Sequence, residues 1–200
     1  MIVSMLKLKR ADFKHIKDAY SVHKIVYSLF PKKKDSGRDF LYVDKGSDRE
    51  CRKIFILSER SPKSAGVGEL FSHPIPDSFL NFDRYRFEVL LNPVKKEGKT
   101  GKLIPVKEVA ELNEWFVNKV KAYGFDVDKR TLEIHINNVQ SFEKNYSGEN
   151  LRVTHNSALF KGVLEVKERD VFAESFKHGI GKGKAFGFGL LQIVPLKDLE

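Results

Sequence analysis

Apolar and polar residues alternate over Ile2–Lys9, which predicts a first strand. Further along, Asp18 is a typical N-cap residue. Apolar positions then recur at helical spacing as far as Phe30, and Pro31 ends the predicted helix. The rest of the first half is predicted to contain strands at 38–44, 52–58 and 85–91, and a stretch rich in Gly, Pro and Ser at 62–77 that is mostly loop.

The second half follows much the same order, although no repeat is visible as sequence identity. Apolar residues at helical spacing predict a helix over 106–123, and Gly124 follows it as a C-terminal glycine. The remaining elements are predicted as strands at 132–142 and 151–166 around a polar turn, a short helix from Asp170 to His178 that Gly179 ends, and a last strand at 185–194.

Strand, helix, two strands, a possible short helix and a strand, followed by much the same again, is the order of the ferredoxin-like fold. We therefore expect the α+β class, with two tandem ferredoxin-like (βαββαβ, RRM-like) domains and antiparallel sheets. The expected domains cover residues 1–92 and 93–200. A single sheet of mixed origin fits this order less well.

Composition narrows the class of protein and of partner. The 200 residues are 41% hydrophobic with 16 Phe, which excludes a disordered tail, and no apolar run approaches the length of a membrane-spanning helix. The single cysteine, Cys51, excludes a disulfide framework and favours the reducing cytoplasm. Residues 1–100 hold 21 Lys and Arg against 13 Asp and Glu, which indicates either a nucleic-acid partner or a solvated Lys-rich face.

The most distinctive segment runs from Gly179 to Leu191 and contains five of the 14 glycines and two lysines. Glycines at this density let the backbone approach a ligand closely, and the lysines add positive charge. The segment lacks the flanking residues of a Walker A loop and the βαβ context of a dinucleotide fingerprint. From Lys184 onward it resembles the RNP1 string of RNA-recognition motifs. The alternative is a structural glycine-rich strand that packs its phenylalanines in the core.

A second constellation lies on the first predicted helix. Tyr20, His23 and Tyr27 are spaced so that they share one stripe beside the apolar face, and Lys24 borders it. A histidine with a phenol one turn away is a plausible acid–base pair, because imidazole titrates near neutral pH. The alternative is a half-buried histidine with aromatic neighbours.

The other histidines show no spacing typical of a metal site, and we expect neither a metal nor a small-molecule cofactor. A serine-nucleophile elbow and a cysteine-nucleophile signature around Cys51 are absent as well. These other histidines are His15, His73, His135, His155 and His178.

Taken together, these residues resemble the CasE family, the CRISPR-repeat endoribonuclease of the type I-E Cascade complex, over nearly the whole chain. The glycine-rich segment, preceded by Gly-Val-Leu-Glu-Val at 162–166, is the most specific of the matching motifs. The others are Tyr20-x-x-His23 with Leu-Phe-Pro at 29–31, Phe-Leu-Tyr at 40–42, Leu-Ser-Glu-Arg at 57–60, and Arg-Phe-Glu-Val-Leu-Leu-Asn-Pro at 86–93 with Gly-Lys at 101–102 and Ile-Pro at 104–105.

The resemblance implies metal-independent cleavage of precursor CRISPR RNA at the base of each repeat hairpin, in a complex with other Cascade subunits. It implies that His23 transfers protons and that Tyr20 positions or stabilises the scissile phosphate. A second catalytic role for His15 stays open, as does whether His23 acts as base, acid or both. The implied RNA-binding residues are Lys24, Lys144, Arg152, Gly179, Gly181, Lys182, Gly183 and Lys184.

RNA carries its own nucleophile, the 2′-hydroxyl, so the expected products end in a 2′,3′-cyclic phosphate and a 5′-hydroxyl, and the enzyme is expected to stay bound to the hairpin. One alternative is a non-catalytic RNA-binding subunit of a CRISPR ribonucleoprotein on the same scaffold. Another is a single-strand RNA binder, which would need exposed aromatic side chains on a central strand.

Overall fold

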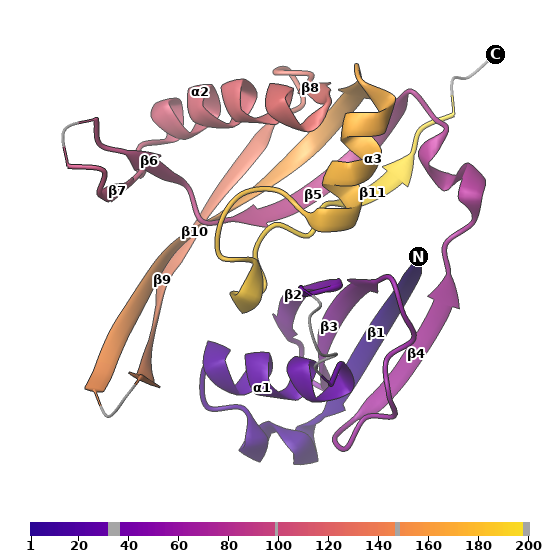
Figure 1. The fold of residues 1–200 in the computed structure, drawn as a ribbon, viewed down its shortest axis with the longest axis vertical. Coiled ribbons are helices and arrows are strands. Elements are labelled where there is room, and N and C mark those ends of the chain that lie inside the picture. The colour runs from indigo at the N-terminus through magenta and orange to yellow at the C-terminus, as the bar shows by residue number, and fades with distance from the viewer. Residues whose placement is uncertain (32–36, 99, 147–148, 198–200) are drawn as a thin grey trace.

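The computed structural model describes residues 1–31, 37–98, 100–146 and 149–197, and the side chains of residues 137–155 lie outside that description. The chain folds into two halves, each an antiparallel sheet with helices on one face (Figure 1). None of the described helices has the length and apolar character needed to cross a bilayer.

The first half is a four-stranded sheet in the order β2-β3-β1-β4, with α1 against one face (Figure 1). This is the strand order of a ferredoxin-like domain, although residues 59–68 between β3 and β4 form no second helix. The elements are β1 (Ile2–Lys9), the 3-10 turn η1 (Arg10–His15), α1 (Ala19–Leu29), β2 (Phe40–Ser47), β3 (Cys51–Ser58) and β4 (Glu69–Pro74).

Alternation along β1 creates the first core. Leu6 and Leu8 point to the α1 side of the sheet and are fully buried, whereas Val3 on the opposite face is 39% exposed. On α1, Val22 and Val26 lie one turn apart and pack into the same core. Fully burying a side chain of this size stabilises the fold by roughly 1.5–3 kcal/mol, so this stripe holds α1 on the sheet.

The second half is a larger sheet in the order β11-β5-β10-β8, in which β9 also pairs with β10. Helices α2 and α3 lie on one face of this sheet (Figure 1). Its elements are η2 (Asp77–Leu80), β5 (Arg84–Leu91), α2 (Val109–Val120), η3 (Lys121–Tyr123), β8 (Phe125–Val127), β9 (Glu133–Tyr146), β10 (Glu149–Val166), α3 (Arg169–His178), η4 (Lys184–Phe186) and β11 (Gln192–Pro195), with β6 (Val94–Lys96) and β7 (Leu103–Pro105) forming a separate hairpin.

Two predicted strands differ from the structure. The strand predicted to close the first half lies in the second sheet as β5, because β4 formed within the predicted loop at 62–77 and took the edge beside β1. Strand pairing therefore favours a division between Pro74 and Arg84 over the expected one between residues 92 and 93. The last strand begins only at Gln192, because Gly187 and Gly189 both adopt positive φ, which interrupts extended backbone.

The two halves share a hydrophobic core. In β2, residues Phe40–Val43 are all buried, because its side chains alternate between the α1 face and the second half. Leu41 and Val43 pack with Leu91 from β5 and Leu190 from the glycine-rich segment. This packing sets the first sheet against the loop that follows α3.

We expect Asp18→Ala to lower the free energy of unfolding by about 1 kcal/mol, measured by urea denaturation. The Asp18 carboxylate accepts hydrogen bonds from the Ser21 backbone N–H (2.8 Å) and hydroxyl (2.7 Å), and so caps α1. Asp18→Asn keeps an acceptor oxygen and is the matched control, which should stay close to the wild type. If Asp18→Ala loses no more unfolding free energy than Asp18→Asn, the acceptor oxygen at position 18 does not stabilise α1.

Candidate functional site

The aromatic stripe predicted on α1 is present in the structure and meets a residue from the other half. The rings of Tyr20 and Tyr27 lie 5.6 Å and 3.9 Å from the ring of His23, centroid to centroid. The ring of Phe186, in η4 of the glycine-rich segment, stacks on His23 at 5.3 Å. His23 is half-buried, held between rings from both halves of the chain.

A backbone hydrogen bond determines which nitrogen of the neutral imidazole carries the proton. Nδ1 of His23 lies 2.7 Å from the carbonyl oxygen of Ala185. A carbonyl oxygen only accepts hydrogen bonds, so Nδ1 carries the proton and donates it. In the neutral ring the lone pair then lies on Nε2, and this atom can take up a proton and return it.

The glycine-rich segment brings Ala185 across to α1. Its turns are so tight that a Cβ on Gly189 would lie 2.3 Å from the backbone oxygen of Ile180, and one on Gly179 would lie 2.8 Å from that of Gly189. The segment is therefore packed on itself, and η4 contacts both α1 and β2. Phe188 is fully buried and Phe186 stacks on His23, so the segment does not form the RNP1 strand that its sequence resembles.

Each described lysine predicted to bind RNA lies at or near this junction, but their environments differ. Lys182 and Lys24 are exposed, and the Lys24 ammonium lies 4.9 Å from the centre of the Tyr20 ring. The Lys184 ammonium instead donates to the carbonyl of His178 at the end of α3 (2.8 Å). Partial burial, followed by the nearby charges of Arg38 and Lys119, lowers the pKa of Lys184.

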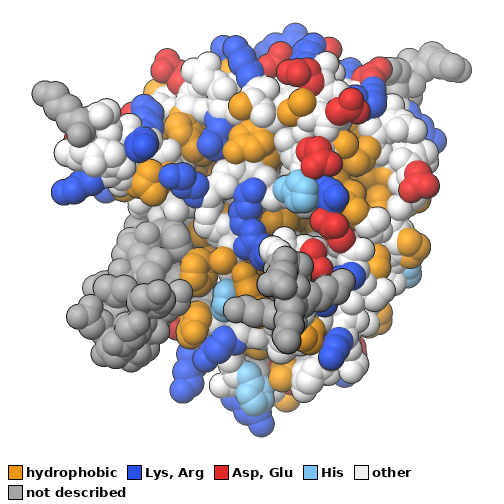
Figure 2. Space-filling view, in the orientation of Figure 1, with side chains coloured by type: hydrophobic (Ala, Val, Ile, Leu, Met, Phe, Trp, Pro, Cys, Tyr) orange, Lys and Arg blue, Asp and Glu red, His pale blue; other side chains and the backbone are white. Residues whose placement is uncertain are grey.

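No sequence pattern pointed to Arg38 or Lys119, because the two lie 81 positions apart and only the tertiary fold brings them both near Lys184. Among the described side chains, none of these three cations forms an ion pair with a carboxylate. Lys and Arg side chains also gather near the centre of the face shown in Figure 2, where the glycine-rich segment crosses between the halves. This concentration of positive charge is suited to a polyanion.

Two predicted RNA contacts cannot be placed by their side chains. Lys144 and Arg152 lie in the long β9–β10 hairpin, opposite Leu151 and Glu143 in the strand register. Their side chains are outside the described part of the structure, so both stay predictions. His15 lies in η1 just before α1 and is exposed, and nothing in its surroundings assigns it a role.

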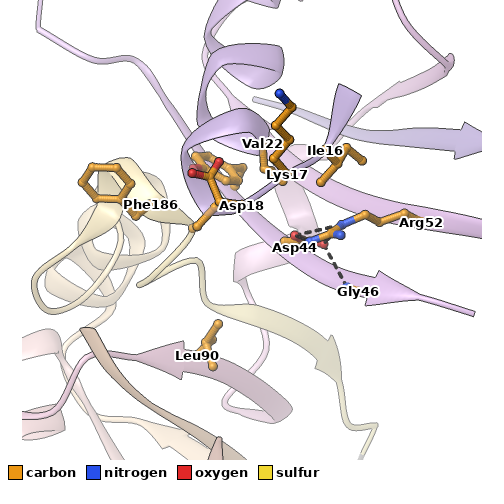
Figure 3. A pocket seen from close by; sticks show the side chains of 12 residues that line it. Ile16, Lys17, Asp18, Val22, Asp44, Gly46, Arg52, Leu90 and Phe186 are labelled. Atoms are coloured by element: carbon orange, nitrogen blue, oxygen red, sulfur yellow. Dashed lines mark hydrogen bonds and ion pairs between the residues drawn. The ribbon is translucent and has the colours of Figure 1, made fainter. Parts of the chain in front are cut away.

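A cavity of about 480 Å³ opens beside the stripe, between the start of α1, β2 and the glycine-rich segment (Figure 3). Phe186 connects the cavity with the aromatic stripe on α1, because it lines the cavity and its ring stacks on His23. In the cavity, Nε of Arg52 lies 3.0 Å from both carboxylate oxygens of Asp44. Among the residues that the structure describes, no group of three His, Cys, Asp or Glu side chains could hold a metal ion.

The family profile and the curated relatives that match this chain are all CRISPR-associated proteins. A sequence profile of the family described as CRISPR associated protein matches residues 1–195. The Escherichia coli K12 protein "CRISPR system Cascade subunit CasE" is 24% identical over 193 residues, covering 90% of this chain and 94% of the relative. "CRISPR-associated endoribonuclease Cse3" of Thermus thermophilus is 24% identical over 207 residues, covering 93% and 94%.

The fold agrees with a solved structure. "CRISPR endoribonuclease Cse3 bound to 19 nt RNA" superposes with a TM-score of 0.80 at 24% sequence identity, covering 98% of this chain and 100% of that one. This likeness confirms the predicted fold class of tandem ferredoxin-like domains with antiparallel sheets.

The glycine-rich segment can be tested with two glycines that both have positive φ. Gly46 (φ +75°) has nothing within 4 Å of the position of an added Cβ, whereas Gly189 (φ +84°) meets backbone. We expect Gly46→Ala to cost about 1 kcal/mol of unfolding free energy and Gly189→Ala about 2 kcal/mol more, measured by urea denaturation. If the two variants lose equal stability, the close packing of the segment is not what requires glycine at 189.

Proposed function

Because the chain belongs to the CRISPR associated protein family, we propose that it is the endoribonuclease that cleaves precursor CRISPR RNA at the base of the repeat hairpin. The relative from Thermus thermophilus is named an endoribonuclease, and the solved structure described above holds RNA. Within this chain, the proposal is carried by His23, whose Nδ1–H donates to the Ala185 carbonyl, because this hydrogen bond places the lone pair of the neutral ring on Nε2.

The reaction needs alignment and proton transfer and no external nucleophile. The ribose 2′-oxygen loses its proton and forms a bond to the adjacent phosphorus, the bond from phosphorus to the 5′-oxygen breaks, and the 5′-oxygen takes up a proton. The products are a 2′,3′-cyclic phosphate and a 5′-hydroxyl. Nε2 of His23 serves one or both of these proton transfers, a contribution worth roughly 10²- to 10⁴-fold in rate.

Negative charge grows on the phosphate oxygens during this step and is stabilised by donors and cations already in place. Tyr20 and Lys24 lie on α1 beside His23, and Lys24 is held near the Tyr20 ring. We assign Tyr20 and Lys24 to the scissile phosphate. Arg38 and Lys119, whose charges help to lower the pKa of Lys184, suit the neighbouring phosphates of the RNA together with Lys184.

The hairpin is bound through its backbone and shape, because the deep, narrow major groove of A-form RNA hides most base edges. The β9–β10 hairpin, with Lys144 and Arg152, lies along the stem, and the enzyme keeps the product. The Escherichia coli relative is named a Cascade subunit, which supports other Cascade subunits as partners of this chain. Repeat RNA is the second partner in this proposal, and the cytoplasm is the proposed site of action.

Removing the imidazole is the central test. We expect His23→Ala to reduce the single-turnover cleavage rate of a repeat hairpin at least about 100-fold, with the hairpin dissociation constant unchanged, because proton transfer is lost and phosphate contacts remain. The matched control is His73→Ala, an exposed histidine on β4, which should cleave like the wild type. His15→Ala, measured in parallel, decides the open role of that residue. Normal cleavage by His23→Ala would refute the assignment.

The nucleophile and the independence from metal need separate measurements. A 2′-deoxy ribose on the 5′ side of the cut should abolish cleavage, and excess EDTA should leave the rate unchanged. End-group analysis should find a cyclic phosphate and a 5′-hydroxyl. Cleavage of the deoxy substrate, or loss of activity in EDTA, would contradict the mechanism. Tight hairpin binding without any cleavage would instead favour a non-catalytic RNA-binding subunit.

Salt dependence tests the binding surface. We expect Lys182→Ala to weaken hairpin binding and to reduce the slope of log affinity against log salt concentration by about 1, because one phosphate contact is lost. Lys167→Ala is the control, since that lysine is engaged by Glu165. A slope unchanged by Lys182→Ala would remove this residue from the RNA-binding surface.

A further inference from the structure

The carbonyl of Ala185 accepts a second hydrogen bond that the reaction scheme does not use. Tyr42, on β2, is only 1% exposed, and its hydroxyl donates to the Ala185 oxygen at 2.9 Å. Nδ1–H of His23 donates to the same oxygen at 2.7 Å. A carbonyl oxygen has two lone pairs, so it can accept both hydrogen bonds at once.

We propose that Tyr42 is a positioning residue for His23: its hydroxyl holds the Ala185 carbonyl where it accepts from Nδ1 and thereby keeps Nε2 as the proton-exchanging atom. This inference rests on the proposed function of His23. Tyr42 acts on the imidazole through the backbone of the glycine-rich segment, since both side chains donate to the same carbonyl oxygen.

The backbone around Ala185 depends on such a restraint. Gly183 and Gly187 flank η4, both with positive φ, and glycine backbone has more conformational freedom than any other. The Tyr42 ring also lies beside Gly187, where an added Cβ would come within 3.2 Å of it. Tyr42 therefore contacts the segment at two places, and its hydroxyl selects which way the Ala185 carbonyl points.

The chemistry of Tyr42 suits a permanent donor. Its burial raises the pKa of the hydroxyl well above the ordinary value, with smaller contributions from nearby groups. The hydroxyl therefore keeps its proton across the working pH range of a histidine and donates to this carbonyl throughout.

The chain offers a matched control for a buried tyrosine hydroxyl. Tyr85 is fully buried in the second half, and its hydroxyl donates to the Phe79 carbonyl at the same 2.9 Å. Tyr42→Phe and Tyr85→Phe both remove the hydroxyl of a fully buried tyrosine. The Tyr85 hydroxyl also accepts from the Phe82 backbone N–H (3.1 Å), so Tyr85→Phe should lose at least as much stability as Tyr42→Phe. Only Tyr42→Phe should affect His23.

Kinetics provide the first readout. We expect Tyr42→Phe to reduce the single-turnover cleavage rate about ten- to a hundredfold, a loss typical of misplaced catalytic groups, with the hairpin dissociation constant unchanged. Tyr85→Phe should cleave at the wild-type rate. If both variants cleave equally fast, or if Tyr42→Phe weakens hairpin binding and leaves the bound rate unchanged, Tyr42 does not position His23.

The histidine tautomer provides a second readout that needs no RNA. In protein labelled with ¹⁵N-histidine, the nitrogen shifts distinguish Nδ1–H from Nε2–H, and His23→Ala assigns the His23 signals. We expect neutral wild-type His23 to be Nδ1–H, and Tyr42→Phe to shift it toward the Nε2–H form while Tyr85→Phe does not. A wild-type Nε2–H tautomer, or an unchanged tautomer in Tyr42→Phe, overturns the inference.

The experiments distinguish a failure of the proposed function from a failure of the positioning role of Tyr42. If wild-type protein shows no cleavage in any condition, the proposed function fails, and the tautomer experiment still decides whether Tyr42 orients the imidazole. If wild-type protein cleaves and the tautomer or rate does not respond to Tyr42→Phe, only the positioning inference fails. Should Tyr42→Phe not fold, the wild-type tautomer alone still tests the geometry.

Discussion

One carbonyl group, that of Ala185, joins the two halves of the molecule at the proposed site of chemistry. It accepts from His23 on the first helix and from Tyr42 on the first sheet, but it belongs to a loop of the second half. Neither half alone could present the imidazole with its Nδ1 proton engaged. The orientation of the proposed catalytic group therefore depends on the docking of the halves, and that docking depends on the shared core around β2 and the segment after α3.

The glycine-rich segment illustrates how sequence resemblance and structural role can separate. Its glycines suggested close approach to a ligand, yet the close approach that the structure shows is to the chain itself, at Gly179 and Gly189. Its resemblance to the RNP1 string pointed to RNA recognition, and the alternative placed its phenylalanines in the core; Phe188 is in the core and Phe186 stacks on His23. The segment thus supports His23 through the Phe186 ring and the Ala185 carbonyl. Its exposed Lys182 is directly available to a polyanion.

The junction between the two halves also concentrates positive charge. Positive charges that are distant along the chain converge near Lys184, where partial burial makes its charge harder to solvate. A folded protein that keeps cations together without a carboxylate among the described side chains loses some stability by doing so. A bound phosphate backbone would remove that repulsion, which is why the junction, rather than the Lys-rich N-terminus as a whole, is the better candidate for RNA contact.

Short-range patterns in the chain were enough to predict the helices, most strands, the ferredoxin-like order and the His23 stripe, because these follow from periodicity and from capping by residues such as Asp18. They could not assign β5 to its sheet, because an apolar strand can pair in either sheet. β5 pairs with β10 and β11 in the second sheet, whereas β4 takes the place beside β1 in the first, and only the whole fold decides this. Nor could they identify Tyr42, Arg38 or the Ala185 carbonyl as parts of the site. These groups meet through packing between distant segments, and a backbone oxygen leaves no mark on the amino-acid pattern at all.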